Sequence, residues 1–251
     1  MDFPLRYGTP ASYGANFIHV GEHCQTASEL PLDLREFVED PTSKGTIYIA
    51  FGSIVNWRVA PIEVIKVFFS ALNSLTDYRV IFSYTGPEVE VKSHVKIVKW
   101  APQLDILAHN KTALFFTHGG LKSVKEGICS STPMLFLPFF ADQPRNALFA
   151  QRLGIAEAIY KKNITTAEVS FKINKILSDA NYGLRIREVN RQYLDNVIDP
   201  LDYGSHWTMR LIKQSDNHSF FYKNRGRLLS WISFLYLDIV VGVSLLHLIV
   251  Q

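Results

Sequence analysis

The stretch THGGLKS, residues 117–123, places a histidine and two glycines directly ahead of a predicted helix. Glycine lets a ligand approach the backbone closely, and the first N–H groups of a helix attract phosphate. His118 can donate a hydrogen bond to the same anion, and Ser123 adds a hydroxyl in the first helical turn. The pattern matches neither G-x-G-x-x-G nor the Walker loop. The alternative is a plain strand-to-helix turn at Gly119-Gly120, with a structural histidine beside it.

A second group of candidates follows two other predicted strands. Trp100, in the stretch KWAPQ, could stack on a nucleobase, and Gln103 could bind a base edge or a sugar. Ser53 follows Gly52 after a strand and offers another hydroxyl to an anion. The alternative for Trp100 is ordinary core packing at the end of a strand. Together these residues indicate a site that takes a base and an anion.

Carboxylates and an amide that suit sugar hydroxyls complete the set. Glu126 lies two helical turns after Gly119 and could reach a ribose. Asp142 and Gln143 follow another predicted strand and offer acceptors and donors. Each of these residues, taken alone, is more often a solvated polar residue. Their occurrence at successive strand ends favours one cleft with base, anion and polyol chemistry.

Short apolar runs that alternate with helical patterns supply the elements that must position these residues. Runs of β-branched and aromatic residues predict buried strands, and apolar residues at helical spacing predict the helices between them. Such alternation indicates a parallel sheet covered on both faces, which binds ligands at the carboxyl ends of its strands. We therefore predict an α/β, Rossmann-like domain over residues 46–215, with helices through about Tyr193. The predicted strands are TIYIAF, RVIFSY, VKIVKW, ALFFTH, PMLFLP and IAEAIY.

Composition limits the classes of function. The 251 residues are 47% hydrophobic, which is enough for a domain with a real core. A net charge of +3, with the basic residues scattered, does not indicate nucleic-acid binding. Cys24 and Cys129 are too few for a disulfide framework or a CxxC metal site, so the cysteine count leaves the compartment open. Residues 1–45, punctuated by proline and glycine, predict a linker or incomplete N-terminal region with one short helix in LPLDLREFVED.

Residues 228–250 differ in kind from the rest of the chain. The run is apolar for long enough to cross a bilayer as a helix, although Asp238 interrupts it. A hydrophobic terminal helix packed on a core is the alternative. Basic residues on the N-terminal side favour a cytosolic domain, whereas the sequons at Asn110, Asn163 and Asn217 have meaning only in a lumenal one. The residues alone leave the side of the membrane open.

The segment WAPQLDILAHNKTALFFTHGGLKSVKEGICSSTPMLFLPFFADQ, residues 100–143, closely resembles the signature of the UDP-glycosyltransferases, in particular the animal, membrane-anchored UDP-glucuronosyltransferases. The similarity extends upstream to IYIAFGS and downstream to ADQPRNALFAQRLGIAEAI. It covers nearly the whole chain, but only the C-terminal half of a family member. The resemblance implies the donor-binding half of a GT-B fold. It also implies a C-terminal helix in the endoplasmic reticulum membrane, with the catalytic part in the lumen.

The resemblance also implies roles within the donor site. Trp100 would stack on uracil, Gln103 would contact the uridine, and Glu126 would bind the ribose hydroxyls. Asp142 and Gln143 would bind the sugar. The residues that would hold the diphosphate are Ser53, His118, Ser123 and, through their backbone, Gly119 and Gly120.

No residue of this chain matches the family's catalytic histidine or its partner aspartate, which lie in the N-terminal half with the acceptor pocket. In the family, that histidine takes a proton from the acceptor, which attacks the anomeric carbon as UDP leaves. The resemblance implies a UDP-sugar co-substrate, a small lipophilic acceptor, no cofactor and no metal, and it allows oligomers with relatives. Lys122 stands where many relatives carry asparagine.

Two functions remain open from the sequence. The first is transfer of a hexosyl or glucuronosyl group from a UDP-sugar, with this chain supplying the donor-binding half. The second is a non-catalytic chain that binds a UDP-sugar, or pairs with longer relatives, without turnover. A serine hydrolase, which HGG alone would allow, is excluded because the chain has no G-x-S-x-G elbow.

Overall fold

The computed structural model describes residues 17–162, 164–213 and 229–250. Among these, residues 20–200 form one compact unit, and residues 17–19 group with 201–213 and 229–250 in another. All the predicted site residues lie in the first unit. Of the sequon residues, Asn110 is exposed, whereas Asn163 and Asn217 lie outside the described residues.

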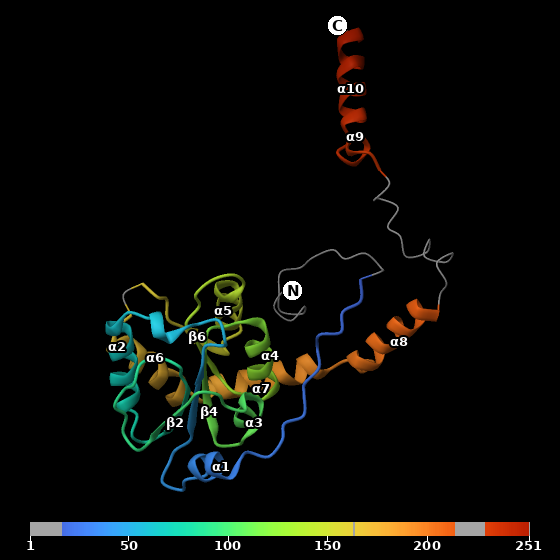
Figure 1. The fold of residues 1–251 in the computed structure, drawn as a ribbon. Helices are drawn as coiled ribbons and strands as arrows, with labels where there is room; N and C mark the ends of the chain where they lie inside the picture. The colour runs from blue at the N-terminus through green and yellow to red at the C-terminus, as the bar shows by residue number, and fades with distance from the viewer. Residues whose placement is uncertain (1–16, 163, 214–228, 251) are drawn as a thin grey trace. The chain divides into compact units, whose positions relative to one another are not determined.

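The first unit is built on a six-stranded parallel sheet with the strand order β3-β2-β1-β4-β5-β6 (Figure 1). All five residues of β1 are buried, as expected for a central strand that is covered on both faces. The parallel α/β prediction is confirmed. The strands are β1 (Thr46–Ala50), β2 (Arg79–Ser83), β3 (Val95–Val98), β4 (Thr112–Thr117), β5 (Met134–Phe136) and β6 (Ala156–Ala158).

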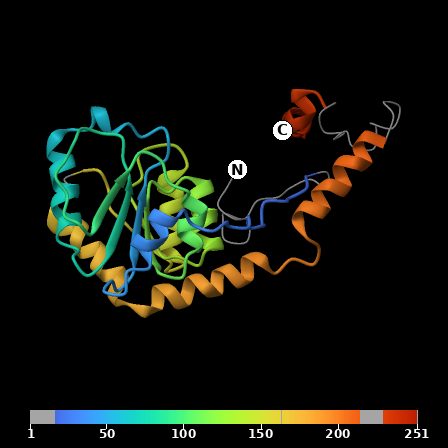
Figure 2. The same cartoon turned by 60° about the horizontal axis from the view of Figure 1, so that its bottom comes forward.

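Helices cover both faces of this sheet (Figure 2). Most buried helical residues of the core on one face come from α2 (Ile62–Asn73) and α6 (Thr166–Ser178), and Trp57 and Tyr182 join them. The core on the other face is shared by α1 (Leu32–Val38), α3 (Gln103–Ala108), α4 (Leu121–Cys129), α5 (Gln143–Arg152) and α7 (Ala180–Leu194). This double cover explains why the strands read as continuous apolar runs.

Two elements of the structure were not predicted. The short helix η1 (Trp57–Val59) follows β1, and α8 (Pro200–Lys213) extends beyond the last expected helix. Pro200 is the only buried residue of α8 among those described. A helix that buries so little needs no continuous apolar face, so its sequence carries a weak signal.

The segment predicted as a linker is partly packed on the domain. The helix expected in LPLDLREFVED is α1, and its residues Leu34 and Val38 are buried against the sheet. The compact unit therefore includes residues 20–45 and ends at Pro200, whereas the predicted domain spanned residues 46–215.

A disulfide joins Cys24 to Cys129, the last residue of α4, with the Cα atoms 5.6 Å apart. The cysteine count gave no reason to expect it, because the two residues are 105 positions apart and only the fold brings them together. Beside the disulfide, the Tyr193 hydroxyl of α7 donates a hydrogen bond to the Gly21 carbonyl at 2.6 Å. The N-terminal arm is thus attached to both α4 and α7.

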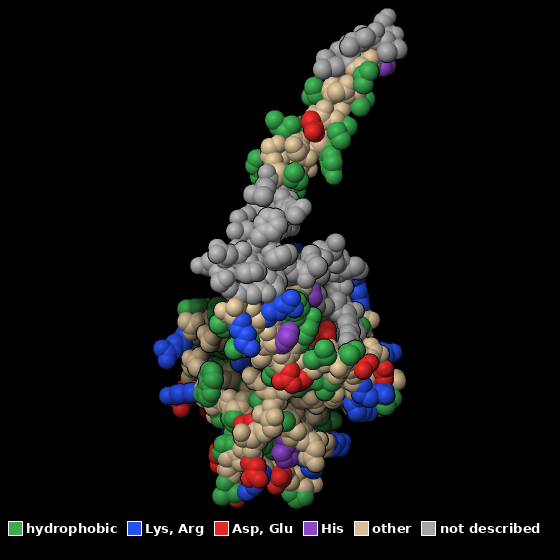
Figure 3. Space-filling model, turned by 90° about the vertical axis from the view of Figure 1, so that its right-hand side faces the viewer, with side chains coloured by type: hydrophobic (Ala, Val, Ile, Leu, Met, Phe, Trp, Pro, Cys, Tyr) green, Lys and Arg blue, Asp and Glu red, His purple; other side chains and the backbone are tan. Residues whose placement is uncertain are grey.

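The apolar C-terminal segment contains two helices, α9 (Trp231–Phe234) and α10 (Leu237–Val250). They are separated at Tyr236, whose φ of 56° interrupts the helical geometry. Hydrophobic side chains are prominent on their surface (Figure 3). In the described part of the chain, no helix combines the length and the apolar composition needed to cross a membrane. The predicted spanning helix at 228–250 is not confirmed.

Candidate functional site

The strands that precede the predicted site residues end level with one another. Ala50 of β1 pairs with Thr117 of β4, and Thr117 pairs with Phe136 of β5. On the other side, Ala50 pairs with Ser83 of β2, and Ser83 pairs with Val98 of β3. The loops that follow therefore leave the sheet at the same edge, as parallel strands require. These loops carry Ser53, Trp100, His118 and Asp142.

Gln103 connects the first turn of α3 to α4 and to β1. Its Nε2 donates a hydrogen bond to Glu126 Oε2 at 2.5 Å, and the Tyr48 hydroxyl donates to its Oε1 at 3.3 Å. The predicted uridine and ribose contacts are therefore neighbours. Burial, with a smaller contribution from the charge of Glu126, raises the pKa of Tyr48, so its hydroxyl remains a donor. Lys122, the residue that departs from the family pattern, lies 3.9 Å from Glu126 Oε1 through its Nζ.

The imidazole of His118 lies close to two glycines. A Cβ atom at Gly120 would lie 2.5 Å from His118 Nε2, and one at Gly52 would lie 3.0 Å from its Cε1. Gly52 also has a φ of 73°, which side-chain-bearing residues rarely adopt. The absence of side chains at Gly52 and Gly120 therefore leaves space for the His118 ring. From the sequence, Gly120 was explained only by the close approach of a ligand. Burial lowers the pKa of His118 more than the charge of Asp142 raises it, which favours the neutral imidazole.

The start of α4 is open to an anion. Gly120, which precedes its first residue, forms no side-chain cap, so the first N–H groups of this nine-residue helix are left for another acceptor. Ser123, in its first turn, is 8% exposed, and its hydroxyl forms no hydrogen bond within the described chain. Ser53 is exposed and likewise forms none there. The predicted diphosphate contacts therefore retain their donors.

Asn146, which the sequence analysis did not select, holds two predicted residues together. Its Nδ2 donates to the Gly119 carbonyl at 2.9 Å and to Asp142 Oδ2 at 2.8 Å. Asn146 is buried in α5, one turn after Asp142. Ala141, just before that carboxylate, has a φ of 56°, an uncommon conformation for a residue other than glycine. An amide four positions after Asp142 on the same helix is the signal that could have identified Asn146.

Gln143 lies in the site but is less available than predicted. Its side chain is 4% exposed, and its Oε1 accepts hydrogen bonds from the backbone N–H groups of Phe139 and Phe140 at 2.8 and 3.2 Å. The carbonyl oxygen therefore holds the loop before α5. The amide nitrogen is the part of Gln143 that remains for a ligand, whereas Asp142 is exposed.

Trp100 lies at the surface. Its side chain is 82% exposed, so the alternative of core packing is wrong. It lies two residues after the end of β3 and precedes the turn that leads into Gln103. A large aromatic ring this exposed is suited to covering a flat ligand.

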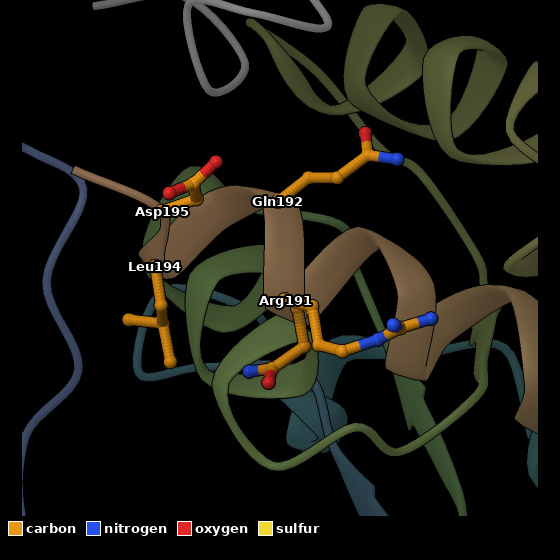
Figure 4. Close-up of a pocket in the computed structure, with 5 residues that line it drawn as sticks. Arg191, Gln192, Leu194 and Asp195 are labelled. Carbon is orange, nitrogen blue, oxygen red and sulfur yellow. The ribbon is translucent and has the colours of Figure 1, made fainter.

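Two hollows of the first unit contain none of the predicted donor residues. The first, of about 480 Å³, lies at the end of α7. Figure 4 shows the side chains of Leu194 and Asp195 pointing to opposite sides there, so they do not converge on a common centre. The second, of about 360 Å³, we call the Arg58 pocket. It is lined by residues 84–89 with Arg58, Ile97 and Lys99.

A six-stranded parallel sheet with helices on both faces and with these side chains at its carboxyl edge defines an α/β domain of the Rossmann type. Solved glycosyltransferases have the same fold. The calicheamicin glycosyltransferase CalG4 aligns with a TM-score of 0.65 and 17% identity, covering 85% of this chain and 52% of that chain. The spinosyn forosaminyltransferase SpnP aligns with a TM-score of 0.61 and 20% identity, covering 74% and 47%. The chain therefore has the fold of about half of a GT-B glycosyltransferase.

A family model described as UDP-glucoronosyl and UDP-glucosyl transferase matches residues 1–251, and the chain belongs to this family. A UDP-glucuronosyltransferase of Pleuronectes platessa is 35% identical over 233 residues, which are 92% of this chain and 48% of that protein. UDP-glucosyltransferase 2 of Dactylopius coccus is 29% identical over 226 residues, 90% of this chain and 43% of that protein. The resemblance read from residues 100–143 is confirmed. The chain spans about half the length of the curated relatives it matches.

Proposed function

We propose that this chain is the donor-binding half of a UDP-glycosyltransferase that transfers a hexosyl or glucuronosyl group to a small lipophilic acceptor. The observation that carries this proposal is the exposed ring of Trp100, three residues before Gln103 of the Gln103–Glu126 pair, at the edge of the sheet where α4 begins uncapped. An aromatic ring, a ribose acceptor and phosphate donors on one edge of the sheet support binding of a nucleoside diphosphate.

In this proposal the uridine lies on the Trp100 side of the site. Uracil stacks on the indole ring, which exchanges exposed apolar surface for contact with the base. Glu126 accepts hydrogen bonds from the ribose hydroxyls, and Gln103 keeps its carboxylate in place from α3. Lys122 neutralises part of the same carboxylate from one turn earlier.

The diphosphate lies at the start of α4. The free N–H groups of the first turn, the hydroxyls of Ser53 and Ser123, and neutral His118 are the donors. If the Thr117 hydroxyl donates to His118 Nδ1, 3.3 Å away, Nε2 carries the proton and can donate to a phosphate oxygen. The sugar extends toward the exposed carboxylate of Asp142 and the amide nitrogen of Gln143.

The contribution of this half to the chemistry is stabilisation of the leaving group. The bond between the anomeric carbon and the β-phosphate oxygen breaks with its electron pair on UDP, while the acceptor oxygen bonds to the same carbon. Preorganised N–H donors at α4 and His118 stabilise the negative charge that develops on the diphosphate. The acceptor proton goes to a base that we assign to none of the described residues.

We further propose that the protein associates with the endoplasmic reticulum membrane and works on its lumenal side. The exposed apolar side chains of α9 and α10 support membrane association. The Cys24–Cys129 disulfide supports an oxidising compartment.

Membrane association is tested by flotation of the full chain with lipid vesicles, compared with a chain that ends at residue 228. Loss of flotation is expected for the shortened chain, and equal flotation would contradict it.

Calorimetric titration of the full chain with UDP, UDP-glucuronate and UDP-glucose tests the donor site. We expect saturable binding of UDP, unchanged by EDTA, and tighter binding of one UDP-sugar. Failure to bind any of the three would overturn the proposal.

Incubation with the preferred UDP-sugar and a lipophilic phenol distinguishes the transferase from the non-catalytic chain. Glycosylated product supports a transferase, whereas donor binding without product supports the non-catalytic alternative.

A further inference from the structure

The Arg58 pocket lies at the same edge of the sheet as the donor site, but on the other face. Its wall residues Val89 and Ile97 pack with the core under α2 and α6. The helices that carry Gln103 and Glu126 pack into the core on the opposite face. The residues that line the pocket therefore include none of the predicted uridine contacts, and different helices cover the two sites.

Two cations line this pocket, and neither has an acidic partner among the described residues. The Nε of Arg58 donates to the Thr85 carbonyl at 3.3 Å, which holds the guanidinium against the loop, and its terminal nitrogens form no hydrogen bond in that part of the chain. Lys99 and Glu88, on the same wall, form no ion pair with each other or with any other described residue. Two positive charges thus face one carboxylate, which leaves a net positive pocket.

The wall of the pocket also contains a buried hydroxyl without a partner. Tyr84 is 4% exposed, and its hydroxyl forms no hydrogen bond in the described chain. That hydroxyl lies against Gly86, where a Cβ atom would come within 2.3 Å of it. The indole N–H of Trp57, whose ring centroid is 5.4 Å from that of Tyr84, is likewise unpaired. Buried polar groups normally have partners, so the unpaired Tyr84 hydroxyl at the pocket wall indicates that a ligand or water pairs with it.

We propose that the Arg58 pocket binds a small organic anion that combines a compact oxyanion with an apolar body. The oxyanion lies between Arg58 and Lys99, which suit a carboxylate, sulfate or phosphate ester. The apolar body lies against Val89 and Ile97, and an oxygen of the ligand pairs with Tyr84. The volume of about 360 Å³ suits such a ligand. This site is additional to the proposed donor site and does not depend on it.

Calorimetric titration of the full chain with phenyl phosphate, in the presence and absence of saturating UDP, tests the proposal. We expect one saturable site that UDP does not occupy and that binds inorganic phosphate more weakly. Arg58→Ala should weaken phenyl phosphate binding about ten-fold or more, because it removes a charge-assisted donor. Lys92→Ala, at an exposed lysine of the same connection, is the matched control and should change it less than two-fold.

A third variant keeps the test independent of folding defects. Glu88→Gln removes the one opposing charge and should tighten phenyl phosphate binding several-fold, which a misfolded chain cannot do. Absence of saturable binding, displacement by UDP, or equal losses in Arg58→Ala and Lys92→Ala would each overturn the proposal. Equal affinity for inorganic phosphate and phenyl phosphate would indicate an adventitious ion only.

Discussion

Trp100 carries a ring of the kind that usually packs in protein cores, but this ring lies at the surface, three residues before Gln103 of the amide–carboxylate pair. Its neighbour Ala101 is buried in the core, so the backbone that carries the ring is anchored while the ring itself is exposed. An anchored, exposed ring loses little further freedom when a base stacks on it. This is the physical basis for assigning the base contact to Trp100.

Replacement of Trp100 by alanine should weaken UDP binding about ten-fold or more, because a base–aromatic stack contributes about 1–3 kcal/mol. Calorimetric titration measures the change, and circular dichroism should show an intact fold. Trp231→Ala, at a tryptophan of α9 that is 76% exposed, is the matched control. Equal UDP affinity in Trp100→Ala and the unaltered chain would show that the ring does not hold the base.

Glu157 on β6 is a residue whose surroundings serve stability. Its carboxylate is buried and accepts hydrogen bonds from Lys172 Nζ at 2.6 Å, from the Tyr182 hydroxyl at 2.6 Å and from Lys175. Burial alone would raise its pKa, but these donors outweigh burial and lower the pKa to about 2. One carboxylate therefore joins the sheet to α6 and α7.

A folded-state pKa below the usual value means that this carboxylate stabilises the fold above pH 4.5 and that the contribution is lost as the pH falls toward 2. Glu157→Gln should lower the free energy of unfolding at pH 7 by about 2 kcal/mol, because charge-assisted hydrogen bonds become neutral. Urea titrations at pH 7 and pH 3 measure it, and the difference between the variants should shrink at pH 3. Glu36→Gln, on the exposed side of α1, is the control. A difference that stays constant with pH would contradict this reading.

At the scale of elements, the proposed anion site depends on the start of α4. The helix begins without a side-chain cap, and His118 lies in the space that the absent side chain at Gly120 leaves. The same helix carries Glu126 toward α3 and ends at the disulfide. A change at its first turn is therefore expected to act on donor binding more than on the fold.

Gly120→Ala should displace the His118 ring, since the new methyl group would lie 2.5 Å from Nε2. We expect about ten-fold weaker UDP binding, as for the loss of one charge-assisted donor. Gly183→Ala, in α7, is the control: its nearest neighbour would be Arg187 at 3.4 Å, so it should leave UDP binding unchanged. Calorimetric titration of both variants decides the point. The idea fails if Gly120→Ala binds UDP as tightly as Gly183→Ala.

At the scale of the whole molecule, the disulfide closes a loop of 105 residues between the N-terminal arm and α4. Replacing both Cys24 and Cys129 by serine should lower the melting temperature by about 5–15 °C, because a cross-link restricts the unfolded chain. Scanning calorimetry measures the shift. The unaltered chain in dithiothreitol should melt like the variant. A melting temperature that neither reduction nor replacement changes would contradict a stabilising role.

Much of the proposed donor site could be predicted because its residues follow local rules. Apolar runs predicted the strands, and parallel strands align their carboxyl ends, so Ser53, Trp100, His118 and Asp142 were expected at one edge. The fold class was predicted for the same reason, because strands and helices depend on neighbours in sequence and on periodicity. The family was predicted from the resemblance of residues 100–143 to a known signature.

Only the tertiary structure determined which residues distant in sequence come into contact. The Cys24–Cys129 bond, the Asn146 bridge from Gly119 to Asp142 and the burial of the Gln143 carbonyl all depend on loops that approach one another through the fold. The same holds for Trp100, because composition cannot tell a core tryptophan from an exposed one. The sequence by itself determined which elements form and what chemistry follows each. The tertiary structure decided which of those groups meet, because side-chain contacts depend on packing that no single segment specifies.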